Sequence, residues 1–322
     1  MPETEKPPAR PVDIYFYWKG NKSMKWLMIV FSVLLFYWLI IYFAFLYTFS
    51  KKIKVNMEKY MRAGYADVLQ ERKKRVLNYP MEEVTIESQD HLKLYGRYFH
   101  LEGHDKLIVM CHGWKSEWYI DFSKLAIWFY EKCNCDLLIM DERGIGRSEG
   151  KYITFGLNEH LDIHDWVMWA HKRQNLPIYL YGTSMGAATV LMTSASLNGI
   201  VSGIIADSPF TQPYDELKDF AKRNIHLPEY PFLPSLNFLV KIFIKRDLKS
   251  INVMDILKDT SMPIVIFHGG LDFFCNVKIS QKIKEMNLAN VSVYIYPDSN
   301  HCCSYVKHEK EYENIISRLI EQ

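Results

Sequence analysis

From residue 81 to the C-terminus, short apolar runs alternate with stretches of helical character. The apolar runs are Lys106–Cys111, Asp136–Met140, Ile178–Tyr181, Ser202–Ala206, Pro263–Phe267 and Val291–Tyr296, and the helical stretches are Phe122–Cys133, His160–Arg173, Ala187–Leu197, Val277–Met286 and Glu309–Ile320. Runs that are apolar at every position are what a sheet covered on both faces requires. The alternation therefore predicts an α/β fold, with a mostly parallel central sheet and helices on both faces. Glu83–Ser88 and Lys93–His100 add a predicted strand pair.

One interval breaks this rhythm. Residues 208–260 separate two predicted strands, which is too long for a plain helical crossover. The stretch Leu227–Pro234 is rich in proline and aromatic residues, and Leu236–Ile244 has the pattern of an apolar helix. We expect this insertion to form a cap over the functional site. The alternative is an elaborated crossover with no lid role.

The pentapeptide Gly182-Thr183-Ser184-Met185-Gly186 lies between the predicted strand Ile178–Tyr181 and the predicted helix Ala187–Leu197, which begins with small residues. This is the strand–turn–helix setting of the G-x-S-x-G elbow, which presents a reactive serine on a sharp turn. Glycine is needed on either side because larger side chains would collide in so tight a turn. The sequence therefore predicts Ser184 as a nucleophile, and an incidental serine in a surface turn is the weaker interpretation.

A serine hydroxyl needs a base, and the base needs an acid that orients it. When the serine lies on such an elbow, the chain order is Ser, acid, His. His301 follows one predicted strand and Asp272 another, so both lie at the carboxyl ends of strands, where open α/β sheets place their sites. We expect His301 to be the general base and Asp272 its orienting acid. Asp207 is the alternative acid, and Asp298 is expected only to shape the turn before His301.

A developing oxyanion needs hydrogen-bond donors. The backbone N–H groups of Met185, directly after the nucleophile, and of Trp114, in the loop after Lys106–Cys111, are the predicted pair. His112 and His268 each precede a glycine at a strand end, and we expect both to be structural.

Four motifs in this order resemble the α/β-hydrolase superfamily, in the branch of serine aminopeptidase-like and acylglycerol-lipase-like enzymes. They are His112-Gly113-Trp114, the D-x-R-G-x-G-x-S-x-G segment Asp141–Gly150, Gly182–Gly186, and His268–Asp272 together with His301. The resemblance implies an α/β-hydrolase fold. Two departures lie near the acid: the family often has Asp where Gly270 stands and Val-Pro where Cys275-Asn276 stand.

The N-terminal region contains a run without charge, from Trp26 to Phe49. About 20 residues suffice to cross the hydrocarbon core as a helix. A cleaved signal peptide would have a shorter apolar stretch and a small-residue cleavage site. We therefore expect one transmembrane anchor at residues 26–49, in a single-pass protein of the cell membrane. The excess of Lys and Arg after the run weakly favours a cytoplasmic catalytic domain, and the side stays open. With this anchor, the chain resembles membrane-anchored hydrolases of Gram-positive bacteria.

These observations predict two regions. Residues 1–80 hold the anchor and a charged, mostly helical connector over 53–77 that Pro80 ends, and residues 81–322 form the hydrolase domain with its cap insertion at about 208–260. The net charge is only +2, with Lys and Arg spread along the chain, so we expect no nucleic-acid partner. The six cysteines have no zinc-like spacing, and we expect free thiols, no metal and no cofactor.

The expected activity is hydrolysis of a small ester or lipid-like substrate through an acyl-enzyme on Ser184. A peptidase or amidase and an acyltransferase would use the same residues and stay open. A membrane-tethered binding module without turnover is the alternative from another class. Cys302 and Cys303 beside His301 are either a source of oxidation sensitivity or incidental.

Overall fold

A computed structural model describes residues 22–53 and 65–321. The chain divides into two compact units, residues 1–44 and residues 45–322. Helix α1 (Lys22–Phe49) starts in the first unit, and its last turn, Phe45–Phe49, belongs to the second. Within the described ranges α1 is the one helix long and apolar enough to cross a bilayer: Met24–Phe49 has a mean hydropathy of 2.5. The helix begins four residues before the predicted anchor because Lys22-Ser-Met-Lys25 continues its turns.

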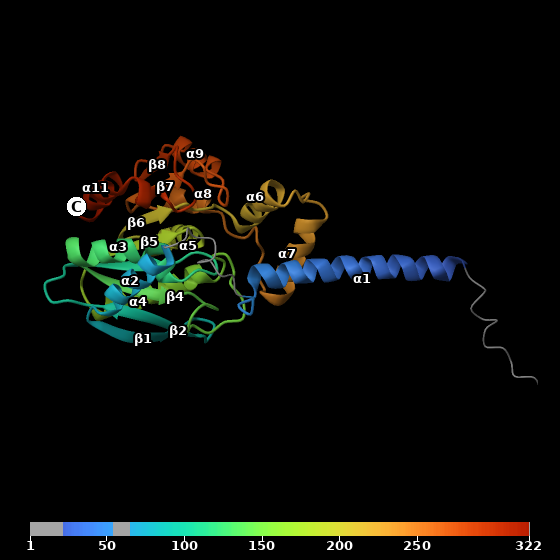
Figure 1. The fold of residues 1–322 in the computed structure, drawn as a ribbon, viewed down its shortest axis with the longest axis horizontal. Coiled ribbons are helices and arrows are strands. Elements are labelled where there is room, and N and C mark those ends of the chain that lie inside the picture. The colour runs from blue at the N-terminus through green and yellow to red at the C-terminus, as the bar shows by residue number, and fades with distance from the viewer. Residues whose placement is uncertain (1–21, 54–64, 322) are drawn as a thin grey trace, which may run out of the picture. The chain divides into compact units, whose positions relative to one another are not determined.

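The second unit is built on a sheet of eight strands in the order β1-β2-β4-β3-β5-β6-β7-β8 (Figure 1). The strands are β1 (Met81–Glu87), β2 (Lys93–Phe99), β3 (Lys106–Cys111), β4 (Cys135–Asp141), β5 (Ile178–Thr183), β6 (Val201–Asp207), β7 (Ile264–Gly269) and β8 (Val291–Tyr296). The pairs β1–β2 and β2–β4 are antiparallel, and every other pair is parallel. The predicted, mostly parallel α/β sheet is confirmed.

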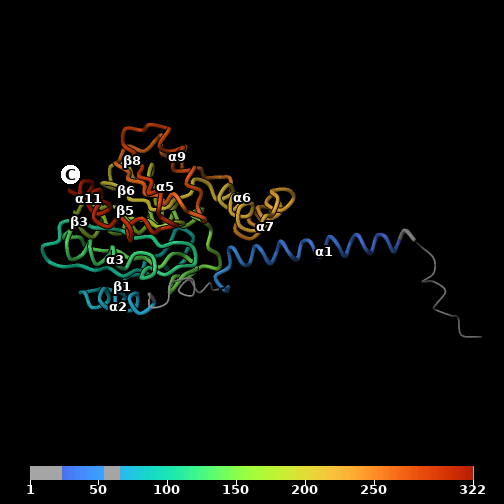
Figure 2. The backbone as a smooth tube through the Cα atoms, turned by 45° about the horizontal axis from the view of Figure 1, so that its top comes forward, coloured from blue at the N-terminus to red at the C-terminus, as the bar shows by residue number. Residues whose placement is uncertain are grey.

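Helices cover both faces of this sheet. The helices that follow α1 are α2 (Tyr65–Leu77), α3 (Trp118–Lys132), α4 (Glu159–Arg173), α5 (Met185–Thr193), α6 (Pro213–Asn224), α7 (Phe232–Phe243), α8 (Val253–Ile256), α9 (Lys278–Glu285), α10 (Ser304–Lys307) and α11 (Glu309–Ile320), of which α6, α7 and α8 lie in the segment between β6 and β7. Side chains of α2, α3 and α11 form one buried cluster with the strands, and α2 lies beside α3 (Figure 2). Helix α5 packs on β3, β5 and β6 and contacts α4.

Several boundaries differ from the sequence prediction. Helix α3 starts at Trp118 rather than Phe122, because a first helical turn precedes a kink at Phe122, where φ is −144°. Helix α5 ends at Thr193, and Ser194–Leu197 tightens into a 3-10 turn. Of the predicted connector helix, Tyr65–Leu77 is helical, and residues 54–64 lie outside the described residues.

Between β6 and β7 the chain forms α6, α7 and α8; α6 and α7 lie to one side of the sheet (Figure 1), whereas α8 packs against α5. These helices fall where a cap insertion is expected, at about 208–260, and their role as a cap stays a prediction. The apolar helix predicted at Leu236–Ile244 is α7, which begins earlier, at Phe232, and buries Leu233, Leu236 and Val240.

Candidate active site

Ser184 lies on a strained turn between β5 and α5. Its backbone has φ 56° and ψ −116°, a region that residues other than glycine rarely adopt. A Cβ at Gly182 would stand 2.3 Å from the carbonyl oxygen of Gly186, and one at Gly186 would stand 2.3 Å from that of Cys111 in β3. The predicted need for glycine on both sides of the serine is confirmed. The turn leaves Ser184 partly exposed at the carboxyl end of the central strand.

Three side chains that are far apart in the sequence meet at this turn. His301 Nε2 lies 2.9 Å from Ser184 Oγ, and His301 Nδ1 lies 2.7 Å from Asp272 Oδ2. Asp272 comes from the loop after β7 and His301 from the loop after β8. The structure thus brings together the nucleophile, base and acid predicted from the sequence, in hydrogen-bonding order.

The Asp272 carboxylate is held in a fully buried position. Its Oδ1 accepts the backbone N–H groups of Phe274 and Cys275, both at 2.9 Å, and His268 Nε2 lies 3.3 Å from its Oδ2. Burial alone would raise the pKa of Asp272, but these contacts with His268 and His301 outweigh it and leave the pKa below its usual range. Asp272 therefore stays ionised. His268, expected to be purely structural, also contacts the acid.

The ionised acid acts on the histidine. Burial lowers the pKa of His301, yet the hydrogen bond to Asp272 and its charge raise it by more, so the net pKa lies above the ordinary value. The Nδ1–H of His301 is fixed by Asp272, and Nε2 is left to accept the Ser184 proton. This is the protonation pattern that a general base requires.

Two backbone N–H groups have no protein acceptor in the part of the chain that the structure describes, one next to Ser184 in the chain and one next to Gly113, where an added Cβ would stand 3.4 Å from the Ser184 Cβ. They belong to Met185, the first residue of α5, and to Trp114, in the loop after β3. The N-terminus of α5 adds the positive end of its dipole at the same place. The predicted oxyanion donors are therefore available, and their role remains a proposal.

Asp121 is a site residue that sequence reasoning missed. Its partly buried carboxylate accepts the Gly113 N–H at 2.6 Å and the Ser116 hydroxyl at 2.5 Å, which fastens the loop that carries Trp114. Burial raises the pKa of Asp121, and these hydrogen bonds oppose that effect. No motif marks Asp121, because its partners are set by the kinked start of α3. His112 has the expected structural role, with Nε2 accepting the Glu142 N–H at 3.2 Å.

The alternative acids are engaged elsewhere. Asp207 is buried, and its two carboxylate oxygens accept the hydroxyls of Tyr312 and Ser208, each at 3.0 Å. Asp298 Oδ1 lies 2.7 Å from His308 Nε2. Among the described residues, the carboxylate that bonds to His301 is therefore that of Asp272. Burial raises the pKa of the Cys302 thiol, which disfavours the reactive thiolate beside the base.

Helix α6 of the insertion docks on the loop that carries Asp272. Arg223 Nη2 donates to the Phe274 carbonyl at 2.6 Å, and Asn224 Nδ2 donates to the Phe273 carbonyl at 3.2 Å. The Phe274 ring lies between those of Phe220, at 6.0 Å, and of the base His301, at 5.1 Å. The insertion thereby contacts the loop that carries Asp272, and through the Phe274 ring it is linked to His301.

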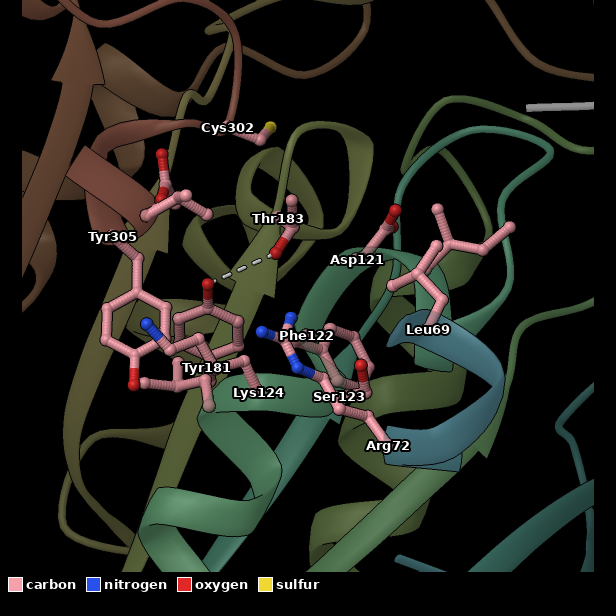
Figure 3. Close-up of a pocket in the computed structure, with 14 residues that line it drawn as sticks. Leu69, Arg72, Asp121, Phe122, Ser123, Lys124, Tyr181, Thr183, Cys302 and Tyr305 are labelled. Carbon is pink, nitrogen blue, oxygen red and sulfur yellow. Dashed lines mark hydrogen bonds between the residues drawn. The ribbon is translucent and has the colours of Figure 1, made fainter. Parts of the chain in front are cut away.

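A small cavity of about 30 Å³ is lined by Asp121, Thr183 and Cys302 among other residues, and Thr183 and Cys302 are the chain neighbours of Ser184 and His301 (Figure 3). It has room for about two water molecules and none for an organic substrate. In residues 22–53 and 65–321, no group of three His, Cys, Asp or Glu side chains could hold a metal ion. The chemistry that this arrangement can carry out is nucleophilic attack by a serine.

Comparison with known proteins agrees with this geometry. Residues 102–252 match the sequence model of a family described as serine aminopeptidase, S33. Protein YqkD of Bacillus subtilis is 25% identical over 232 residues, which cover 69% of this chain and 74% of that one, and it is named an uncharacterized protein. A yeast protein, YNL320W of Saccharomyces cerevisiae, named an uncharacterized membrane protein, is 27% identical over 41% of this chain and 46% of its own.

Among solved structures, the esterase Pf2001 of Pyrococcus furiosus superposes with a TM-score of 0.62 at 26% identity, covering 77% of this chain and 92% of that one. Together with the strand order and the serine elbow, these similarities show that the chain is a hydrolase of the α/β-hydrolase superfamily.

Proposed function

We propose that the protein is a membrane-anchored serine hydrolase that cleaves carboxylic esters through an acyl-enzyme on Ser184. The observation that carries the proposal is the hydrogen-bonded chain Ser184–His301–Asp272, with distances of 2.9 and 2.7 Å. The similarity to an archaeal esterase supports ester cleavage as the reaction.

The first half of the reaction forms the acyl-enzyme. His301 Nε2 accepts the hydroxyl proton as Ser184 Oγ attacks the ester carbonyl carbon. The carbonyl oxygen becomes negative and is stabilised by the N–H groups of Trp114 and Met185, each of which contributes on the order of 100- to 1000-fold in rate in comparable sites. His301, now an imidazolium stabilised by Asp272, gives its proton to the departing alcohol.

The second half repeats these steps with water. His301 takes a proton from the water, the resulting hydroxide attacks the acyl carbon, and Ser184 leaves with the proton returned by His301. Transfer to an acceptor other than water would need only a different molecule at this step. An acyltransferase is therefore a variant of the same proposal.

The substrate is proposed to be apolar on its acyl side. Leu271 and Phe273, on either side of Asp272, have exposed large apolar side chains, and so does Tyr230 in the insertion. They favour acyl or lipid-like esters over peptides. The match to the serine aminopeptidase model makes aminoacyl amides the second candidate substrate.

The anchor is proposed to be the apolar part of α1. Its length and hydropathy suit a single membrane span, and a yeast relative is named a membrane protein. The excess of Lys and Arg after the span favours a cytoplasmic hydrolase unit.

Labelling of the full-length protein in detergent with a fluorophosphonate probe tests the nucleophile. We expect the wild-type protein and Ser196→Ala to be labelled and Ser184→Ala not to be labelled. Ser196 is the matched control because it is an exposed serine shortly after α5, the helix that begins directly after Ser184. An unlabelled wild-type protein, or equal labelling of Ser184→Ala, would falsify the serine mechanism. The remaining hypothesis would then be a binding module without turnover.

A series of p-nitrophenyl esters, monoacylglycerols and aminoacyl amides on the same preparation tests the substrate. A rise in kcat/KM with acyl length supports a lipid-like ester. Activity confined to acetate or to aminoacyl amides contradicts it and favours a small-ester hydrolase or an aminopeptidase.

A further inference from the structure

We propose that the C-terminal end of α1 is a structural part of the active site. Lys115 and the Trp114 side chain bind this helix end, and these contacts position the loop whose Trp114 backbone N–H is the proposed oxyanion donor. The inference rests on the proposed serine mechanism, because that mechanism gives this N–H its task. It makes Lys115 a positioning residue and gives the anchor helix a role beyond attachment to the membrane.

The first observation is at the helix end. The last carbonyl groups of an α-helix have no partner within the helix. At the end of α1 the Thr48 carbonyl accepts the indole Nε1–H of Trp114 at 2.8 Å. The Lys115 ammonium donates to the carbonyls of Tyr47 and of Ile53, the latter at 2.9 Å. Two successive residues of the loop therefore bind the same helix end.

The second observation is the burial of Lys115, which is only 8% exposed. Burial lowers the pKa of its ammonium to about 8, which shows how much solvation the side chain gives up. Two interactions partly compensate for this lost solvation. They are the attraction of the ammonium to the negative end of the α1 dipole and to the Tyr47 and Trp114 rings, whose centroids lie 5.4 and 5.0 Å from Nζ. An apolar side chain would fill this space without the free-energy cost of desolvating a charge. The role of Lys115 must therefore lie in the hydrogen bonds of its ammonium group.

The third observation is how the loop is held on its other side. Asp121 binds Gly113 and Ser116, the residues on either side of Trp114 and Lys115. Lys115 itself has φ +50°, so the backbone turns sharply there. The loop is thus fastened by a carboxylate at its two ends and by the end of α1 at its middle. Loss of the middle contacts would free the Trp114 N–H while the ends stay in place.

Packing joins the helix end to the rest of the hydrolase unit. Phe49 is fully buried, its ring lies 5.6 Å from that of Phe155, and Phe155 lies 6.1 Å from the Trp114 ring. The Ile153 N–H donates to the Phe49 carbonyl at 2.8 Å. The last turn of α1 is therefore a fixed element against which the loop can be set.

The test uses full-length protein in detergent with Lys115→Met, which keeps the apolar stem and removes the donors. We expect kcat to fall by roughly 10- to 100-fold, which is less than the loss in rate when an oxyanion donor is removed altogether. KM should change by less than about twofold. Phosphonylation of Ser184 by the fluorophosphonate probe should slow in parallel. Lys115→Arg, which retains a cation, should recover most of kcat, and Lys52→Met, an exposed lysine at the same helix end, should match wild type.

A second variant covers the case in which Lys115→Met does not fold. Trp114→Phe keeps an aromatic ring and the backbone N–H but removes the bond to Thr48, and we expect a smaller fall in kcat at unchanged KM. If the variants that fold keep kcat within about twofold of wild type, these contacts only fasten α1 and the inference is wrong. If wild type itself is neither labelled by the probe nor active on esters, the proposed function fails instead, and the two failures are thereby distinguished.

Discussion

At the scale of single residues, the ion pair of Asp272 and His301 controls how the site responds to pH. The general base must be neutral, and Asp272 raises the pKa of His301 above its ordinary value of 6.5. Activity should therefore fall as pH drops through that raised pKa. In Asp272→Asn the charge that raises the pKa of His301 most is gone, while burial still lowers this pKa and only the more weakly acting Asp207 and Glu216 still raise it, so the inflection should move to lower pH. The kcat should also drop by about 10⁴, because the imidazole loses its orienting partner.

The pH dependence of kcat/KM, measured over the acid and neutral range on a short p-nitrophenyl ester, checks this prediction. Asp298→Asn is the matched control: it is the same substitution shortly before His301, on a carboxylate that contacts His308. It should leave the profile unchanged. An Asp272→Asn protein with wild-type kcat, or with its inflection at the same pH, would show that another group orients the base.

At the scale of elements, the turn between β5 and α5 depends on the close approach of α5 to β3. A methyl group at Gly186 would meet backbone atoms of Cys111 and His112, which cannot rotate away. Gly186→Ala should therefore lower the free energy of unfolding by about 1–3 kcal/mol or more, and Tm by about 2–4 °C per kcal/mol. Probe labelling of Ser184 should weaken in the same variant, because the helix must shift.

Thermal unfolding and labelling rates measure this effect. Gly203→Ala in β6 is the control, since a methyl group there meets side-chain atoms of Leu319 and Tyr179, which are able to move. It should cost clearly less. If the two variants lose equal stability, the close approach of α5 to β3 does not depend on glycine at position 186, and the prediction is wrong.

The same elements show what a sequence can predict. Ser184 is predictable because strand, glycine turn and helix are neighbours along the chain, and Asp272 and His301 because each follows an apolar strand whose end has to lie near that turn. Local pattern and sheet topology are enough for such residues. The start of α3 is predicted too late because a kink at Phe122 hides the continuity of the helix.

Asp121 and Lys115 escape prediction for a different reason. Their partners are largely backbone groups: Gly113 N–H for Asp121, and the carbonyls of Tyr47 and Ile53 for Lys115. Any residue type supplies a carbonyl, and nearly any supplies an N–H, so the partner leaves no signature in the sequence. Their importance follows only from how α1, α3 and the loop after β3 meet in the folded chain.

At the scale of the whole molecule, α1 has enough length for two tasks. Met24–Ala44 alone extends about 31 Å at 1.5 Å per residue, which matches a hydrocarbon core of about 30 Å. The last turn, Phe45–Phe49, is then available to the hydrolase unit, to which it belongs by its contacts. The length of α1 therefore allows both proposed roles, a membrane span by its apolar part and contacts of its last turn with the loop that carries Trp114.

The span itself is testable by charge. Leu34 and Leu35 lie near the middle of the apolar helix and are exposed, and each lysine there should cost about 2.5–3.5 kcal/mol of insertion free energy. The double variant Leu34→Lys, Leu35→Lys should therefore be released from membranes by alkaline carbonate, whereas wild type stays in the pellet. Leu101→Lys, at an exposed leucine of the hydrolase unit, should behave as wild type. Release of the wild-type protein, or retention of the double variant, would mean that α1 does not span the bilayer. Probe labelling of the released protein then reports whether the hydrolase unit, with the end of α1 still in place, works away from the membrane.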